Sequence, residues 1–144
     1  MFRRHTCLIL FLVMVFTTAC DREYPHPVPD VVVSFDFNVL HHNLSNPGFS
    51  AQFHKEISGG IGGVFVYRHS MDEFKAFDRA CPSNPHVCVL HINTDNMLLA
   101  SSECCNSTFL LIDGSVVEGS SEFPLKQYRA SFDPATNRVR VSNF

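Results

Sequence analysis

Four cysteines in the second half of the chain are the residues best suited to chemistry. Cys81 and Cys88 lie in one turn-rich stretch, and the adjacent residues Cys104 and Cys105 lie in a second stretch further along. Strand-like sequence flanks both stretches. Cysteine sulfurs bind soft metals, exchange with other thiols, or pair into disulfides that crosslink a small domain. We therefore expect any chemistry of this protein to lie where these two loops meet.

The beginning of the chain has the layout of an export signal. Arg3 and Arg4 precede an apolar run over residues 7–16, which is too short for a comfortable transmembrane helix. Small residues then lead into Cys20, and a small residue directly before a cysteine resembles the cleavage site of bacterial lipoproteins. We predict a signal peptide over residues 1–19 and a lipid at Cys20. The alternative is an ordinary signal peptide in which Cys20 has no role.

The residues after the predicted signal have the composition of a spacer. Residues 20–30 are mostly polar and include three prolines, which disfavour a helix and favour an extended chain. We interpret them as a tether between a membrane of the bacterial cell envelope and one folded domain over residues 31–144. Export, to the periplasmic or outer-membrane side, would also place this domain in an oxidising compartment where disulfides persist.

Length and charge limit what the domain can be and what it can bind. The chain has 144 residues, of which 45% are hydrophobic and 17% charged, enough for one domain with a modest core. The formal net charge is -3, and no basic run occurs beyond the extreme N-terminus, so we exclude nucleic acid as a partner. The remaining partners are a membrane, through the N-terminal lipid, and an envelope protein that the sequence does not identify.

Alternating apolar residues and frequent turn signals predict an all-β fold, a small antiparallel sandwich or barrel. Phe35, Phe37 and Val39, for example, alternate with polar neighbours as in a half-buried strand. The glycine-rich residues 59–63 lack the helix and Lys-Ser/Thr of a phosphate site, so we interpret them as a turn that lets two backbones approach closely. The expected strands cover residues 31–39, 64–68, 74–79, 87–91, 97–101, 108–112, 116–117, 125–132 and 138–141.

Two disulfides are expected among the four cysteines of an exported domain, and they can connect in three ways. A bond between the neighbours Cys104 and Cys105 would close a strained small ring, which disfavours one connectivity. Both remaining connectivities tie the first loop to the second.

The two loops and the residues after them resemble the Rieske family, whose all-β domain carries a 2Fe–2S cluster between two loops. The family's first loop reads Cys-x-His followed by a further cysteine, and its second reads Cys-Pro-Cys-His-Gly-Ser-x-Phe. Cys81 and Cys88 match the first loop's cysteines, and Cys104 matches the second cysteine of the second loop. The resemblance covers roughly residues 60 to 144. It extends to Ser107, Phe109, Asp113, Gly114, Gly119, Pro124, Leu125 and Tyr128.

The resemblance fails at the positions that would hold the cluster. Ser83 stands where the family has one histidine and Cys105 where it has the other, while Ser102 replaces a ligand cysteine. Asn106 also replaces the glycine that follows. Because a Rieske cluster needs two thiolates and two imidazoles, we expect that this protein has lost the cluster and holds no cofactor. Its role would then be structural or binding rather than catalytic.

The resemblance also implies how the cysteines pair. In the family pattern the two extra cysteines form a disulfide between the loops, which here would join Cys88 to Cys104. Without a cluster, Cys81 and Cys105 would occupy facing ligand positions. We predict that they form a second disulfide, a covalent replacement for the metal bridge.

Two other interpretations of the loops stay open. Cys81, His86, Cys104 and Cys105 offer ligands for a 2Fe–2S cluster or another metal, with His86 in the missing histidine's role, which would make an electron-transfer protein. His86 is also explained as an ordinary surface histidine of the loop. The second interpretation is a thiol-redox protein centred on Cys104 and Cys105, although the sequence has no Cys-x-x-Cys motif.

Overall fold

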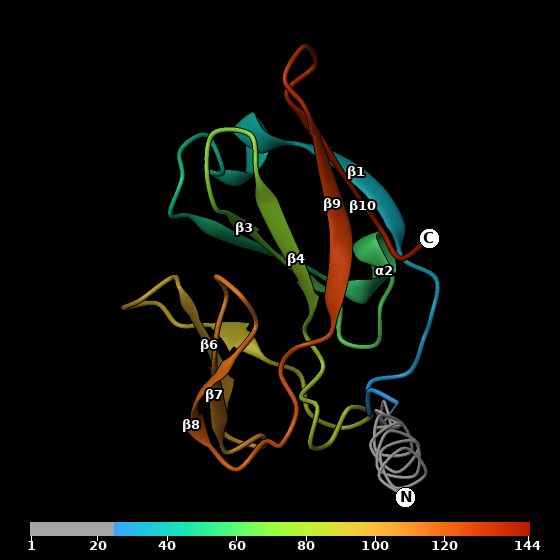
Figure 1. The fold of residues 1–144 in the computed structure, drawn as a ribbon, viewed down its shortest axis with the longest axis vertical. Helices are drawn as coiled ribbons and strands as arrows, with labels where there is room; N and C mark the ends of the chain where they lie inside the picture. The colour runs from blue at the N-terminus through green and yellow to red at the C-terminus, as the bar shows by residue number, and fades with distance from the viewer. Residues whose placement is uncertain (1–24) are drawn as a thin grey trace, which may run out of the picture.

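The computed structural model describes residues 25–144, which form two antiparallel sheets (Figure 1). The larger sheet curls into a half-barrel and has six strands in the order β1-β10-β9-β4-β3-β2. These strands are β1 (Ser34–Asn38), β2 (Ser50–Phe53), β3 (Val64–Arg68), β4 (Phe74–Asp78), β9 (Gln127–Asp133) and β10 (Arg138–Ser142). Two helical turns, η2 (Val39–His42) and α2 (Lys55–Ser58), follow β1 and β2. Among the described residues, no helix is both long and apolar enough to cross a membrane.

The smaller sheet contains the residues between β4 and β9. Its four strands are hydrogen-bonded in chain order, and it lies below the half-barrel in Figure 1. They are β5 (His91–Ile92), β6 (Leu99–Ser102), β7 (Ser107–Leu110) and β8 (Val116–Gly119). One cysteine loop connects β4 to this sheet, and the other connects β6 to β7. The prediction of an all-β fold with two cysteine-bearing loops is therefore confirmed.

Two apolar clusters hold the sheets, and β3 contributes to both. Val64 and Val66 lie in the cluster inside the half-barrel, whereas Phe65 and Tyr67 lie in the cluster between the two sheets. Successive side chains of a strand point to opposite faces, so β3 is buried on both sides and its sequence is almost continuously apolar. The second cluster also contains three of the four loop cysteines, which places the disulfides in the core that joins the sheets.

The strand expected over residues 87–91 is largely absent. Val87 is 74% exposed at the tip of the first cysteine loop, and Val89 makes only an isolated bridge to Ala80. Regular pairing begins at His91, where β5 meets β6. The apolar residues suggested a strand, but Val87 and Cys88 lie in the turn that brings Cys88 opposite Cys81.

The described end of the predicted tether packs against the domain. Val28 is fully buried, and its carbonyl accepts a hydrogen bond of 2.8 Å from the amine of Lys126. Lys126 also forms an ion pair of 2.6 Å with Asp30, and Nε2 of His26 donates to the carbonyl of Pro124 at 2.9 Å. Residues 26–30, which the sequence analysis assigned to the tether, are thus in contact with the domain. The sequence showed the prolines but not the partners that hold this segment.

Candidate functional site

The first cysteine loop is closed by its own backbone. The N–H of Cys81 donates to the carbonyl of Cys88 at 2.9 Å, and the N–H of Cys88 donates to the carbonyl of Asn84 at 3.0 Å. Just before Cys81, the bridge between Ala80 and Val89 continues the pairing of the two chain segments. These bonds hold Cys81 and Cys88 opposite each other, and both side chains are fully buried.

The second cysteine loop is the tight connection between β6 and β7. The N–H of Cys105 donates to the carbonyl of Ser102 at 3.1 Å, and Asn106 has a φ of 49°, in the left-handed region. Asparagine tolerates this region better than most residues, which explains how Asn106 can stand where the Rieske pattern has glycine. The hydroxyl of Ser107 accepts hydrogen bonds of 3.1 Å from the N–H groups of Ser120 and Ser121 and so ties the loop to the chain after β8.

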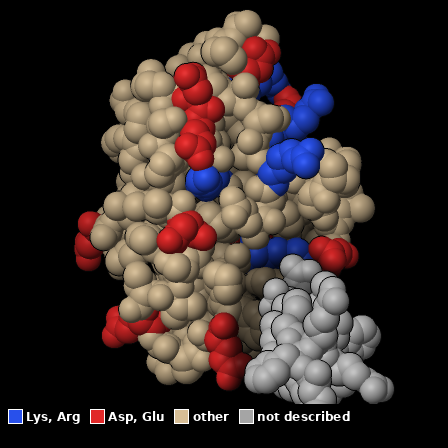
Figure 2. Space-filling view, in the orientation of Figure 1, with Lys and Arg blue, Asp and Glu red and all other residues tan. Residues whose placement is uncertain are grey.

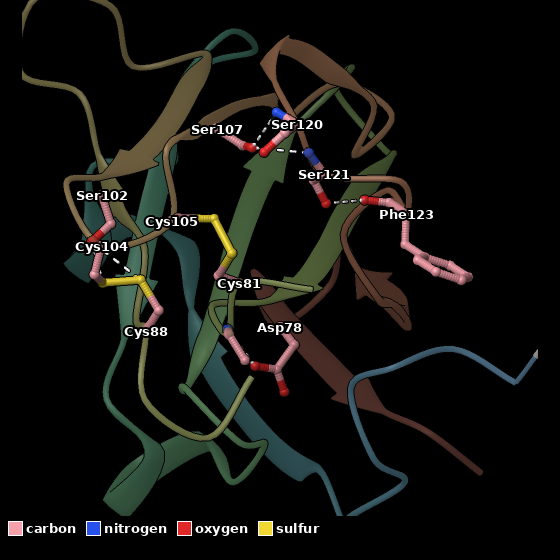
Figure 3. Close-up of a disulfide and its surroundings, with 11 residues drawn as sticks. Asp78, Cys81, Cys88, Ser102, Cys104, Cys105, Ser107, Ser120, Ser121 and Phe123 are labelled. Carbon is pink, nitrogen blue, oxygen red and sulfur yellow. Dashed lines mark hydrogen bonds between the residues drawn. A yellow bond between two sulfur atoms is a disulfide. The ribbon is translucent and has the colours of Figure 1, made fainter. Parts of the chain in front are cut away.

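Two disulfides join the loops, side by side in Figure 3. Cys81 is bonded to Cys105 with a Cα–Cα distance of 5.9 Å, and Cys88 to Cys104 with a Cα–Cα distance of 5.8 Å. The expectation of loop-to-loop disulfides is confirmed, and of the two connectivities left open by the residues alone, this is the one that the resemblance implies. The Cys81–Cys105 bond lies in the apolar cluster between the sheets, whereas Cys104 is exposed.

The residues at the family's ligand positions do not fit a 2Fe–2S cluster. The two cysteines among them, Cys81 and Cys105, are bonded to each other and offer no thiolate. Of the other two, Ser83 is exposed on the first loop, and the hydroxyl oxygen of Ser102 lies 3.1 Å from Sγ of Cys104. Neither pair of ligands that the cluster requires is therefore present, and no electron-transfer step through such a cluster follows from this site.

The other metal interpretation meets the same obstacle. His86 is exposed on the first loop, while Cys81, Cys104 and Cys105 belong to disulfides that separate them into two crosslinks. Throughout residues 25–144, no three His, Cys, Asp or Glu side chains gather as a group that could hold a metal ion. The set of His86 and three cysteines is thus not brought together as ligands.

Asp78, a residue that the sequence did not single out, anchors the start of the first loop (Figure 3). It is fully buried at the end of β4. Its Oδ1 accepts from the N–H groups of Gly62 at 3.0 Å and Ala80 at 2.7 Å. Its Oδ2 accepts from the N–H of Ile61 at 2.8 Å and from the hydroxyl of Tyr128 at 2.6 Å. The glycine-rich turn therefore does bind an anion, but the anion is a carboxylate of the same chain.

Two neighbours of Asp78 have shifted pKa values. Burial, and then the hydrogen bond to Asp78, raise the pKa of Tyr128 well above its usual range, so its hydroxyl stays a proton donor. Burial lowers the pKa of Arg79, an effect that the charge of Asp78 opposes. The guanidinium of Arg79 donates to the carbonyls of Leu90 at 3.2 Å and Phe53 at 3.3 Å. These bonds hold the half-barrel to the loop that carries Cys81 and Cys88.

Gly62→Ala is expected to lower the free energy of unfolding by about 1–3 kcal/mol, the usual cost of overpacking. A Cβ at this position would lie 2.6 Å from the backbone nitrogen of Ala80 and 2.7 Å from the carbonyl carbon of Arg79, so the turn would have to move away from Asp78. Urea unfolding of the variant and the parent measures the difference. A variant as stable as the parent would contradict this close approach of the two backbones.

The predicted signal peptide and the lipid site at Cys20 lie outside the described residues. They remain predictions.

Comparison with protein-family models and with curated proteins found no match. Two solved structures show a weak likeness in fold. One, from Mycobacterium tuberculosis, is described as the small subunit of an NADH-dependent nitrite reductase; it is 18% identical, with a TM-score of 0.47, over 80% of this chain and 98% of that one. The other is the ferredoxin of carbazole 1,9a-dioxygenase from Nocardioides aromaticivorans IC177; it is 17% identical, with a TM-score of 0.48, over 79% of this chain and 97% of that one. Neither activity is transferred to this chain.

Proposed function

We propose that this protein is an exported, lipid-anchored β domain, similar to a Rieske protein without its cluster, with a structural or binding role in the bacterial cell envelope. The observation that carries the proposal is the bond between Cys81 and Cys105. These residues match ligand positions of the family, and their sulfurs are used for a crosslink instead. The loops that would present a cluster are thereby fixed to each other without one.

The framework of the loops supports the same interpretation. Residues that keep the family pattern help to hold the loops in this structure. The hydroxyl of Ser107 accepts hydrogen bonds from two backbone N–H groups. Gly114 packs against Phe77, where an added Cβ would come within 2.8 Å of the ring. Three of the four ligand positions, by contrast, depart from the pattern, at Ser83, Ser102 and Cys105. Such a division is expected of a domain that keeps its shape after the reason for binding iron has gone.

Mass analysis of the mature protein with iron determination is the test of cluster loss. Under non-reducing, anaerobic conditions we expect the peptide pairs Cys81/Cys105 and Cys88/Cys104 and no iron above background, because the ligand thiolates are consumed by the crosslinks. Anaerobic handling matters because air would destroy a labile cluster and oxidise its ligands. Free Cys81 and Cys105 together with stoichiometric iron would overturn the proposal.

The lipid anchor needs a separate measurement, since the disulfides do not depend on it. We expect the protein to incorporate labelled palmitate and to sediment with membranes, and Cys20→Ala to abolish both. Cys7→Ala is the matched control, because Cys7 lies within the apolar run of the predicted signal. Equal labelling of the parent and Cys20→Ala would refute the anchor and leave an ordinary export signal.

A further inference from the structure

The two disulfides differ in how well an external thiol can reach them. Cys81, Cys88 and Cys105 are 0%, 0% and 5% exposed, whereas Cys104 is exposed on the β6–β7 connection. Thiol–disulfide exchange requires a thiolate to reach one sulfur along the line of the S–S bond, so access decides which disulfide reacts. Of the two bonds, only Cys88–Cys104 has an exposed half.

A hydroxyl group lies beside the accessible disulfide. The oxygen of Ser102 is 3.1 Å from Sγ of Cys104 and 3.8 Å from Sγ of Cys88. Both sulfurs are bonded to each other and carry no hydrogen, so the hydroxyl is the donor. A donor at this place stabilises negative charge that develops on sulfur as the bond breaks, and a better-stabilised leaving thiolate departs faster.

The surroundings of Cys104 are acidic. Residues 80–125 contain no Lys or Arg, and their five carboxylates are exposed, namely Asp95, Glu103, Asp113, Glu118 and Glu122. Figure 2 shows acidic and no basic side chains over the part of this face where the smaller sheet lies. Glu103 and Glu118 also line an open polar groove next to Ser102. A negative field of this kind favours the approach of cationic molecules and slows that of anions.

We propose that Cys88–Cys104 is an exchangeable disulfide, opened by a partner protein that carries a reactive dithiol on a basic surface, while Cys81–Cys105 is a permanent crosslink. This activity goes beyond the structural or binding role proposed above and does not depend on the lipid anchor. The exposed Cys104, the hydroxyl of Ser102 and the acidic surroundings carry it.

The exchange proceeds in two balanced steps. A thiolate of the partner attacks Sγ of Cys104, the bond to Cys88 breaks, and its electron pair leaves on Sγ of Cys88 within reach of the Ser102 hydroxyl. The partner's second thiolate then attacks the partner's own bonded sulfur and releases Cys104. Cys88 and Cys104 take up two protons and two electrons, and the partner's dithiol becomes a disulfide.

The order in which the two disulfides open tests the proposal. The folded, full-length mature protein is treated with dithiothreitol without denaturant, alkylated at intervals and analysed by peptide mass mapping. We expect Cys88 and Cys104 to be labelled together at least about tenfold faster than Cys81 and Cys105, because only the first pair includes an exposed cysteine. Simultaneous opening of both disulfides, or earlier opening of Cys81–Cys105, would overturn the assignment.

Substitution of Ser102 tests its role as a positioning residue. Ser102→Ala is expected to open Cys88–Cys104 about fivefold more slowly, the effect of one hydrogen bond, and Ser102→Thr to restore the rate because it keeps a hydroxyl. Ser101→Ala is the matched control, since the hydroxyl of Ser101 has no described bond to either sulfur. A rate in Ser102→Ala equal to that of Ser101→Ala, or no rescue by threonine, would refute the role of the hydroxyl.

Charged thiols test the kind of partner. We compare cysteamine, which is cationic, with mercaptoethanesulfonate, which is anionic, each normalised to its rate with a neutral small-molecule disulfide. At low salt the cationic thiol should be favoured by a factor on the order of three or more, and high salt or the double variant Glu103→Gln/Glu118→Gln should reduce this preference. Glu56→Gln, on the larger sheet's side, should leave it unchanged. Equal normalised rates at low salt would exclude a basic partner.

Discussion

Asp78→Ala is expected to lower the free energy of unfolding by about 3–5 kcal/mol, because each buried donor left unsatisfied costs about 1–3 kcal/mol before water can enter. The substitution removes the acceptor of four hydrogen bonds at once, three from backbone N–H groups and one from Tyr128. Urea unfolding measures the effect on stability. The yield of correctly paired disulfides after oxidative refolding measures the effect on the loop that begins two residues later.

The matched control for this prediction is Asp36→Ala. Asp36 forms an ion pair with Arg138 on the exposed face of the larger sheet, and pairs in such positions contribute at most about 1 kcal/mol. If Asp78→Ala proved as mild as Asp36→Ala, the carboxylate would not hold the glycine-rich turn to the cysteine loop.

The double variant Cys81→Ala/Cys105→Ala is expected to lose about 3–4 kcal/mol through the larger entropy of its unfolded chain, together with the packing of two buried sulfurs. The crosslink spans a sequence separation of 24 residues and lies in the apolar cluster between the sheets. Denaturant unfolding of the parent and the variant gives the difference. Small domains have a free energy of unfolding of only about 5–15 kcal/mol, so this loss is a large fraction of the total stability. We therefore expect the variant to unfold at a lower temperature than the parent.

The other disulfide provides the control for packing. Cys88→Ala/Cys104→Ala removes a crosslink with a sequence separation of 16 residues, for which the chain-entropy cost is similar, but Cys104 is exposed. We therefore expect the Cys81/Cys105 variant to be the less stable of the two. If the Cys88/Cys104 variant were the less stable, the buried disulfide would not contribute more to the stability of the loops than the exposed one.

The sequence predicted the parts of the fold that depend on local pattern. Val139 and Val141 alternate with arginines in β10, and β3 begins with four consecutive apolar residues, so both strands were predicted to within a residue of their ends. The strand predicted over residues 87–91 was wrong, because its apolar residues lie in the turn between the two cysteines of the first loop and in an isolated bridge rather than in a sheet. Composition alone does not distinguish these two uses of valine.

For the candidate site, the cysteines and the family resemblance predicted the two disulfides but not the residues that support the loops. The pairing of Cys81 with Cys105 came from the idea that lost ligand positions would face each other, whereas the residues alone left two connectivities open. Asp78 was missed, because its partners are backbone N–H groups and a tyrosine 50 residues away in the sequence. A clue was present: an acidic residue ends β4, and a run of glycines directly precedes β3, the strand that pairs with β4.

If Cys20 carries the proposed lipid, the packing of residues 26–30 against the domain would limit the distance between the domain and the bilayer. Since the chain is held from His26 onward, a lipid at Cys20 would be separated from the packed domain by residues 21–25, and the six Cα–Cα steps from Cys20 to His26 span at most about 20 Å. With a lipid at Cys20, the domain would therefore remain close to the headgroups, within about its own diameter. Large soluble proteins would be excluded from the gap beneath it, and a partner would have to approach from the side or be membrane-bound itself.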